Sequence, residues 1–494
     1  GNSVEAAAQA EYTKEDDLII TAAFTSEDEL CRAESMGQYA VALETEKGKY
    51  QVVSDTSFLQ NPEIFNELNE SYDADKDIYF GYYEKYKISS KKGIQGTDDA
   101  LTDDLKVQHV LLNLDMSQVI GTEENEGYKL YNYKGKEYYF KDILGDTIYS
   151  LNGWGNNNPY GSHNRSVTVV LLMGWRNELS YLIHPSARRK VAAPYYALNM
   201  QDEKARETFE ALFHWLGETY GADRKYRVSN WTLGNEVNSC KAWNYSGSMS
   251  LNDCVANYTE AFELLYQGIR SSAASPRLFI SLDHCWTTAD AGHNGKSYLD
   301  KFAAYMNEHA PHVQWNVNYH SYSQPLTRST FWSDTSNTTS SVSTKYISMR
   351  NIKVLTDYLS TLEEKYGKEN GSIRVILGEH GFSGRLGNAA EERKQAAALG
   401  YGYYIAMFND RIDAYIIRAY QDAPAETKTG LYLGLQGYKS KKWVSKEAYG
   451  VYKYIDTDQS LDYMDKYLAT VGLKSWESKI SEFDASALAA DPDY

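Results

Sequence analysis

The sequence predicts an α/β fold: a (β/α)8 TIM barrel with a β-rich segment before it and a long insertion between its second and third strands. From about residue 88 onward, short runs rich in β-branched residues alternate with helical patterns, which is typical of βα units and a parallel sheet. Eight such units in succession favour a closed barrel, because open parallel sheets usually have about six strands. Most of the runs also end in polar residues, as strands that open onto one barrel face do.

The predicted strands are largely apolar, as expected for strands that are covered on both faces. We expect them at Ile88–Gln95, Val107–Met116, Val167–Trp175, Trp231–Cys240, Arg277–Trp286, Val313–Tyr322, Arg374–Ser383 and Ile412–Asp422. Apolar residues at helical spacing predict the helices between them. We expect these helices at residues 97–106, 204–221, 252–271, 297–310, 351–367, 391–410 and 446–455.

The chain divides into four predicted parts. Residues 1–18 are polar, small and acidic, so they are expected to form a flexible leader. Residues 19–87 contain strand-like runs separated by turn residues, and are expected to form a β-rich segment packed on the barrel. The catalytic barrel is expected at 88–460 and a C-terminal helical extension at 461–494.

Two long connections are predicted at one end of the barrel. The insertion after the second strand contains a hairpin pattern at 128–140, then a helical stretch, then a run rich in glycine, asparagine and proline at 152–164, which predicts an irregular loop. Another long loop is expected at 184–200. Long loops on one barrel face shape a binding cleft, so these two decide between endo and exo action on a chain.

Charge and hydropathy narrow the function classes. The net charge is −17, which disfavours nucleic acid and anionic membrane surfaces as partners because like charges repel. The sequence has no apolar run of about 18 residues, so no membrane-spanning segment is predicted. The 43 tyrosines supply rings of the kind that stack on sugars, although a high tyrosine content is also a habit of extracellular bacterial proteins.

Cysteine and histidine spacing gives no sign of a metal centre. Four cysteines are too few for a disulfide scaffold, and no CxxC or histidine-rich pattern indicates zinc. Free thiols are expected, with a disulfide among Cys240, Cys254 and Cys285 as the alternative. We therefore expect neither a metal nor another cofactor.

Polar residues stand at the ends of seven of the eight predicted strands. They are Asn113 and Asp115, Trp175–Asn177, Asn235 and Glu236, Asp283 and His284, Tyr319 and His320, Glu379 and His380, and Arg418 and Tyr420. One polar strand end means little, but seven in succession are hard to assign to loops alone. Because the active sites of such barrels lie at the carboxyl ends of the strands, we expect the functional site there.

Two glutamates at these ends indicate a reaction. Glu236 ends the fourth strand and Glu379 the seventh, so in a barrel they lie across the mouth from each other. Cleavage of a glycosidic bond needs such a pair: one carboxyl group protonates the leaving oxygen and the other attacks the anomeric carbon. Their separation sets the outcome, about 5 Å for retention and about 6.5–9.5 Å for inversion.

The neighbouring side chains suit this chemistry. Asn235 is expected to bind the 2-hydroxyl of a sugar, and the Tyr322 hydroxyl to keep Glu379 ionised. The other predicted substrate-binding residues are polar or aromatic and lie at the same strand ends. They are His320, Trp175, His284, Trp286, Arg418 and Tyr420. A structural role at the barrel rim for His320, and core packing for Trp286, remain alternatives.

The motifs Asn-Glu at the fourth strand, His-x-Tyr at the sixth and Gly-Glu-x-Gly at the seventh resemble the clan A glycoside hydrolases. The resemblance implies a retaining mechanism with Glu236 as the acid/base and Glu379 as the nucleophile. The sequence departs from the clan in reading Asn-Glu-Val rather than the commoner Asn-Glu-Pro, and in carrying Arg418 and Tyr420 where many members have a tryptophan. Its second strand also lacks the arginine that supports the nucleophile in many members, and Arg418 is expected to replace it by position.

A second resemblance covers most of residues 88–460. The segments GIQG, LLNLDM, LMGW, HPSAR, YYALNMQ and LGNEVN are similar to a family of secreted bacterial barrel proteins of unknown function. This resemblance implies bacterial origin and export, hence an extracellular or cell-surface location, but adds no substrate.

We therefore expect a retaining glycoside hydrolase that acts on an oligo- or polysaccharide as a monomer. A non-catalytic carbohydrate-binding barrel is the alternative, and a transglycosylase is a third possibility. The acidic pair Glu363 and Glu364 is predicted to lie on a solvated helix face without a role in the reaction.

Overall fold

The computed structural model describes residues 38–39, 41–47, 49–53, 57–58, 89–96, 98–125, 127–152, 165–222, 228–271 and 276–489. The predicted leader at 1–18, Cys31, nearly all of the predicted loop at 152–164 and much of the predicted β-rich segment lie outside these ranges.

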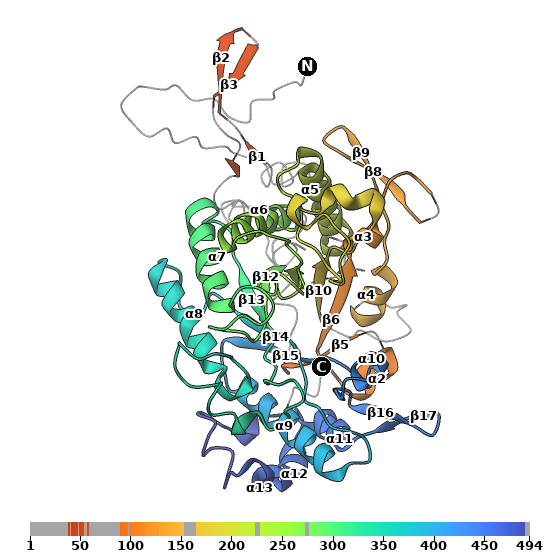
Figure 1. The fold of residues 1–494 in the computed structure, drawn as a ribbon, viewed down its shortest axis with the longest axis vertical. Helices are drawn as coiled ribbons and strands as arrows, with labels where there is room; N and C mark the ends of the chain where they lie inside the picture. Colours follow the sequence, from red (N-terminus) through yellow and green to blue (C-terminus); the bar gives the residue numbers. More distant parts are fainter. Residues whose placement is uncertain are drawn as a thin grey trace, which may run out of the picture.

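Eight parallel strands form a closed barrel, which confirms the predicted fold class (Figure 1). In order around the barrel they are β10 (Ser166–Leu172), β11 (Asn230–Leu233), β12 (Arg277–Leu282), β13 (Asn316–Tyr319), β14 (Val375–His380), β15 (Ile412–Ile417), β5 (Lys92–Gln95) and β6 (His109–Asp115). The ring closes where β15 pairs with β5, with Ile416 beside Gly93. Each predicted strand therefore overlaps one strand of the barrel.

Helices follow the strands and surround the barrel (Figure 1). The longer ones are α2 (Asp99–Asp104), α5 (Glu203–Gly217), α6 (Leu251–Arg270), α7 (Gly295–His309), α8 (Lys353–Lys365), α9 (Ala389–Met407) and α11 (Glu447–Tyr454). Polar residues fix where they begin. The side chain of Asp202 accepts the N–H of Ala205 at the start of α5, and that of Asn294 accepts the N–H of Ser297 at the start of α7.

Smaller elements lie outside the barrel repeat. The insertion after β6 holds a three-stranded sheet and a helix, which confirms the predicted hairpin: β7 (Ile120–Gly121), β8 (Lys129–Tyr133), β9 (Lys136–Phe140) and α4 (Gly145–Asn152). The N-terminal segment contains strands, as predicted: β1 (Gln38–Tyr39), β2 (Ala42–Glu46), β3 (Lys49–Val52) and β4 (Ser57–Phe58). The packing of this segment on the barrel stays a prediction.

The remaining elements are short. The strands among them are β16 (Gln436–Lys439) and β17 (Lys442–Ser445), and the α-helices are α3 (Met116–Val119), α10 (Pro424–Thr427), α12 (Ser460–Met464) and α13 (Leu468–Val471). The short 3-10 helices are η2 (Asn177–Leu182), η3 (Pro185–Ala187), η5 (Phe331–Ser333), η6 (Met349–Asn351), η7 (Asp465–Tyr467) and η8 (Ala485–Ala487). A short π-helix, η4 (Glu218–Ala222), follows α5. Among the described residues, no helix has both the length and the apolar character that crossing a membrane requires.

Most barrel strands end before the polar residues that were assigned to them. The fourth strand is predicted to run from Trp231 to Cys240, but β11 stops at Leu233. Gly234 has φ 72° and Glu236 has φ 45°, left-handed values that an extended strand does not allow. The polar residues after β10, β11, β12 and β15, and His320 after β13, therefore belong to the loops around the barrel mouth. The others lie in the last residues of β6, β13 and β14.

Apolar side chains fill the barrel and the layer between strands and helices. The interior cluster consists of Leu111, Val170, Leu172, Phe279, Ile376, Ala414 and Ile416, all buried. A larger cluster joins the outer faces of the strands to the helices around them. Because this packing makes the strand positions rigid, the loops at the mouth are held from below by a fixed frame.

Glu363 corrects one prediction, because it does not lie on a solvated helix face. Its side chain is 1% exposed, and its Oε1 forms an ion pair with Arg411 Nη1 at 2.7 Å. The same carboxylate accepts the backbone N–H groups of Ile373 at 2.6 Å and Gly371 at 3.0 Å. Its neighbour Glu364 is exposed, as predicted. Glu363 thus ties α8 to the segments around β14 and β15, a long-range role that helical periodicity cannot reveal.

Replacing Glu363 with glutamine is expected to lower the melting temperature strongly, because loss of one partner from a buried ion pair costs about 3–5 kcal/mol. Burial opposes the charge on Glu363, but Arg411 and backbone N–H groups hold its pKa below the ordinary value. The pair therefore contributes fully above the unfolded-state pKa and is lost as pH falls through the lower folded-state pKa. Thermal unfolding at neutral pH, with Glu364→Gln as the control, checks this; equal melting temperatures for both variants contradict it.

Candidate active site

Glu236 lies in a tight loop directly after β11. Its φ of 45° is unusual for a residue with a side chain and costs about 1–2 kcal/mol, so surrounding contacts must hold it. The backbone N–H of Glu236 donates to Ser281 Oγ at 2.9 Å, and that of Val237 donates to the Ser281 carbonyl at 3.0 Å. Strand β12 thereby fixes the direction in which the Glu236 side chain leaves the loop.

His320 lies between the two predicted carboxyl groups. It follows β13 directly, and its Nδ1 is 2.9 Å from Glu236 Oε1 and 4.0 Å from Glu379 Oε2. Because two sides of a triangle limit the third, these oxygens lie no more than about 7 Å apart, a range that includes the roughly 5–5.5 Å spacing of retaining glycosidases. The structure therefore brings together two glutamates that are 143 positions apart in the sequence.

Glu379, in β14, is held by a hydroxyl and a guanidinium group. The Tyr322 hydroxyl donates to Glu379 Oε1 at 2.8 Å, and Arg418 Nε lies 3.5 Å from the same oxygen. Next to Glu379, Gly378 has no room for a side chain, since a Cβ there would lie 2.0 Å from Asn318 Oδ1. Strand β14 thus approaches β13 closely at this point. Both groups contact Glu379 Oε1 and so orient this side chain.

Burial and neighbouring charges shift the pKa values of Glu236 and His320. Burial raises the pKa of Glu236, and the charges of Asp283 and Glu379 add to this effect, although the hydrogen bond with His320 opposes it. Burial acts to lower the pKa of His320, but the hydrogen bond with Glu236 and the nearby carboxylates raise it above its ordinary value. The Glu236–His320 pair therefore keeps a proton more firmly than either group does in water. Burial also raises the pKa of Tyr322, whose hydroxyl stays a donor.

The two asparagines near Glu236 differ in their surroundings. Asn235 is half-buried, and its amide has no hydrogen-bond partner among the described residues. Asn238 is fully buried: its Nδ2 donates to Asp283 Oδ1 at 2.6 Å and to the His293 carbonyl at 3.2 Å, and its Oδ1 accepts the N–H of Asp283 at 3.0 Å. Asn238 thus braces the loop of Glu236 against the loop after β12, while the Asn235 amide is available to a ligand.

Trp286 and Tyr420, two of the predicted sugar-stacking residues, are engaged in internal packing. Trp286 is fully buried; its indole N–H donates to the Val342 carbonyl at 2.9 Å and its ring packs edge-on against Tyr358. Tyr420 is 8% exposed, and its hydroxyl is hydrogen-bonded to Thr102 in α2. A ring packed in this way offers no open face to a sugar.

Trp175 and His284, two further predicted substrate-binding residues, each contact another aromatic ring. Trp175 is half-buried; its indole N–H donates to Asn177 Oδ1 at 2.8 Å and its ring centre lies 5.4 Å from that of Tyr196. His284 stacks on Tyr346 with ring centres 5.4 Å apart, and neither of its buried ring nitrogens has a hydrogen-bond partner in the described part of the chain. Contact of either residue with a substrate stays a prediction.

Three supporting side chains were missed by sequence reasoning. Ser281 holds the backbone of the Glu236 loop, and Glu426 Oε1 lies 3.5 Å from Arg418 Nη2, so it shares this guanidinium with Glu379. Tyr195, from the predicted long loop, lies within the field of Glu379: burial raises its pKa, and the charge of Glu379 adds to the effect. No motif marks these residues, because only their neighbours in space give them a role.

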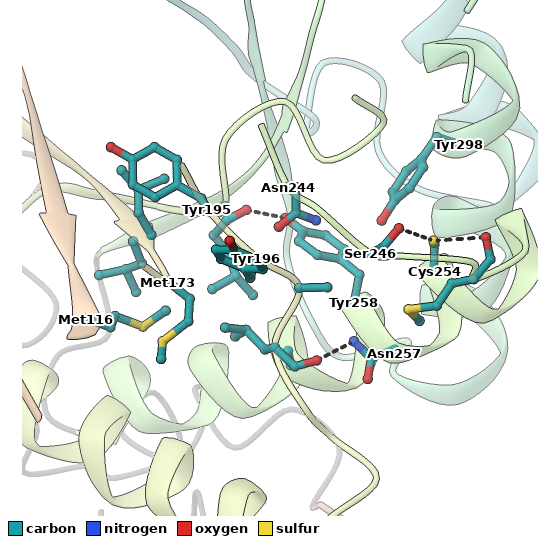
Figure 2. Close-up of a pocket in the computed structure, with 18 residues that line it drawn as sticks. Met116, Met173, Tyr195, Tyr196, Asn244, Ser246, Cys254, Asn257, Tyr258 and Tyr298 are labelled. Atoms are coloured by element: carbon teal, nitrogen blue, oxygen red, sulfur yellow. Dashed lines mark hydrogen bonds between the residues drawn. The ribbon is translucent and has the colours of Figure 1, made fainter. Parts of the chain in front are cut away.

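A separate cavity lies between strands β10 and β11 and helix α6. Figure 2 shows that Met173 and Tyr195 lie on one side of it and Ser246, Cys254 and Tyr298 on the other. Neither of the two glutamates is among the described residues that line this cavity. The carboxyl pair therefore lies outside the lining of this cavity.

Comparison with known proteins gives a family but no reaction. The model of one protein family, described as "Family of unknown function (DUF5722)", matches residues 84–479. No curated protein matches the chain.

Several solved structures of glycosidases are similar to this chain. A hyperthermophilic β-glucosidase from Pyrococcus furiosus is 15% identical with a TM-score of 0.46, over 76% of this chain and 85% of that one. The β-glycosidase from Thermosphaera aggregans is 13% identical with a TM-score of 0.48, over 76% and 86%. A family 39 glycoside hydrolase from Bacteroides cellulosilyticus WH2 is 14% identical with a TM-score of 0.47, over 74% and 64%. Likenesses this distant carry no argument about function, which has to come from the site itself.

Proposed function

We propose that this chain, which belongs to the family of unknown function DUF5722, is a glycoside hydrolase that cleaves an oligo- or polysaccharide with retention of configuration. One observation carries the proposal: His320 Nδ1 lies 2.9 Å from Glu236 and 4.0 Å from Glu379. Burial raises the pKa of Glu236, and the Tyr322 hydroxyl and Arg418 contact the Glu379 carboxyl group. Hydrolysis of a glycosidic bond needs a proton donor and a nucleophile side by side.

In the first step, Glu379 attacks the anomeric carbon while Glu236 gives its proton to the glycosidic oxygen. The bond between that carbon and oxygen breaks, and an ester bond forms between the sugar and Glu379. Tyr322 and Arg418 orient the carboxylate before the attack. Because the Tyr322 hydrogen bond and the ion-pair contact of Arg418 are both to Oε1, we assign the attack to Oε2.

In the second step, Glu236 is ionised and takes a proton from water. The water oxygen attacks the anomeric carbon, the ester bond breaks, and Glu379 returns to a carboxylate. His320 stays hydrogen-bonded to Glu236 and steadies it in both protonation states. The free amide of Asn235 is suited to bind the 2-hydroxyl of the same sugar.

The test is hydrolysis of a panel of aryl glycosides and oligosaccharides, with NMR of the first-formed product. We expect at least one substrate to be cleaved, and the product to keep the anomeric configuration of that substrate. A product of opposite configuration contradicts retention. If glycans bind in a thermal-shift assay but none in the panel is cleaved, the carbohydrate-binding barrel is favoured instead. Such a barrel has no need of two facing carboxyl groups.

Tyr322→Phe is expected to lower kcat about 10–100-fold with little change in KM, because a hydrogen bond to a charged group contributes about 1.5–3 kcal/mol. Tyr319, in β13, offers a matched control: it is fully buried, and its hydroxyl has no hydrogen-bond partner among the described residues. Tyr319→Phe removes the same atom and should leave kcat nearly unchanged. Equal losses in the two variants would show that the effect is on packing rather than on Glu379.

A further inference from the structure

Three metal-binding side chains meet beside the loop of Glu236. Cys240, Cys254 and His293 each offer one ligand atom, and these atoms lie within 4.8 Å of one another. Cys240 lies in the loop after β11, Cys254 in the first turns of α6, and His293 in the loop between β12 and α7. Because the three come from separate segments, no ligand spacing in the sequence reveals the cluster.

The two thiols are shielded from solvent, and the half-buried histidine has an unsatisfied ring nitrogen. Cys240 is 5% exposed and Cys254 is 6% exposed, and both are free thiols. The Nε2 atom of His293 is buried and has no hydrogen-bond partner among the described residues. A buried polar atom without a partner is costly, so its presence beside two thiols indicates a ligand from outside the chain.

The donor set suits zinc. Zn²⁺ binds thiolate sulfur at about 2.3 Å and imidazole nitrogen at about 2.0–2.1 Å in a tetrahedron, which places ligand atoms about 3.5–4 Å apart. The 4.8 Å limit on the three atoms is compatible with such a site after small side-chain shifts. Two sulfurs and an imidazole disfavour Mg²⁺ and Ca²⁺, which prefer oxygen ligands.

The backbone holds the ligands together in the absence of any ion. The N–H of His293 donates to the Asn238 carbonyl at 2.8 Å, so the loop of His293 is hydrogen-bonded to the loop of Cys240. Gly292 packs against the same loop, since a Cβ there would lie 2.7 Å from Cys240 Sγ. Glycine at this position therefore leaves the space that the cysteine occupies. A site arranged in this way loses little conformational freedom on binding.

Room for a fourth ligand lies next to Cys254. The Cys254 thiol donates to Ser246 Oγ at 3.3 Å, and both side chains line the cavity in Figure 2. This cavity has about 20 Å³ available to water centres, which is about what one buried water needs. A water molecule or the Ser246 hydroxyl can therefore complete a tetrahedron.

We propose that Cys240, Cys254 and His293 bind one Zn²⁺, with water or Ser246 as the fourth ligand. The ion joins the loop that carries Glu236 to α6 and to the loop after β12, so its role is to position that loop. A disulfide between Cys240 and Cys254 is the competing arrangement, but it leaves His293 Nε2 without a partner. The site is separate from the carboxyl pair and does not depend on the proposed hydrolysis.

Cobalt substitution tests the site directly. Protein without an affinity tag is reduced, freed of metal with a chelator and titrated with Co²⁺. We expect uptake of one equivalent per chain, with a sulfur-to-cobalt charge-transfer band and the visible bands of tetrahedral Co²⁺, all removed by added Zn²⁺. Zn²⁺ should also raise the melting temperature of the metal-free protein, because it binds the folded state.

Variants identify the ligands. Cys254→Ser and Cys240→Ser should each weaken the charge-transfer band, and His293→Gln should keep the band but lower the Co²⁺ affinity about tenfold or more. Cys285→Ser, a change at another buried cysteine, should leave the spectrum unchanged. The proposal is wrong if the reduced wild-type protein, with its thiols titratable, shows no charge-transfer band. It is also wrong if the protein as isolated has a Cys240–Cys254 disulfide and, once this bond has been reduced, takes up no metal.

Discussion

Glu379→Gln is expected to abolish glycoside hydrolysis, with kcat reduced about 10⁴-fold or more on any substrate that the wild-type protein cleaves. Glutamine keeps the size of the side chain and still accepts the Tyr322 hydroxyl. Its amide, however, cannot form the ester with the anomeric carbon, so the first step has no nucleophile. Initial rates on the best substrate of the panel measure the loss.

Two further measurements separate loss of the nucleophile from loss of the fold. Glu364→Gln makes the same chemical change at an exposed position of α8 and should keep wild-type rates. A 2-deoxy-2-fluoro glycoside of the accepted sugar with a good leaving group should label the wild-type protein on the peptide that contains Glu379. The fluorine slows both steps, but the good leaving group speeds the first, so the ester accumulates. Wild-type turnover by Glu379→Gln, or a label on another carboxylate, means that the nucleophile is assigned wrongly.

The loss of kcat/KM in Glu236→Gln is expected to depend on the leaving group of the substrate. Natural glycosides need a proton on the leaving oxygen, so their kcat/KM should fall about 10²–10⁴-fold. A dinitrophenyl glycoside leaves without a proton, so its first step should lose far less. Steady-state rates on both classes of substrate give the ratio, and equal losses on the two classes contradict the role of Glu236 as the acid.

The pH dependence of kcat/KM is a second test of the role of Glu236. Burial raises the pKa of Glu236 above its ordinary value, and catalysis of the first step needs the protonated form. Wild-type kcat/KM should therefore decline as pH rises through this raised pKa. In Glu236→Gln, the alkaline decline should disappear for the dinitrophenyl substrate, because no proton donor remains to be titrated. If the decline of kcat/KM at alkaline pH is unchanged in Glu236→Gln, a group other than Glu236 causes it.

The barrel could be predicted because its strands are covered on both faces. An apolar run such as the one at β10, with every residue from Ser166 to Leu172 buried, is visible in the sequence without knowledge of its neighbours. The strand ends could not be predicted as well, because the break after β11 depends on the backbone of Gly234 and Glu236. Residue types alone do not distinguish a polar strand end from the loop that follows it.

The pairing of functional groups followed from barrel topology rather than from local pattern. Once Glu236 and Glu379 are assigned to strands four and seven, closure brings them to one mouth, and Tyr322 on the sixth strand end reaches Glu379. Burial of aromatic rings was not predictable in the same way. An aromatic residue just after a strand packs inward, as Trp286 does, or stays half-buried, as Trp175 does, and only the surrounding loops decide.

The pairing of β15 with β5 also determines when the barrel can close during synthesis on the ribosome. Ile416 lies beside Gly93, so the ring cannot close until nearly the whole barrel has been synthesised, about 15–65 s after β5 at typical ribosomal rates. During that time, β5 keeps an open edge to which other chains can add, and Glu379 lacks the arginine that follows β15. Nascent chains should therefore depend on chaperones, and the proposed active site is complete only when the two ends of the sheet meet.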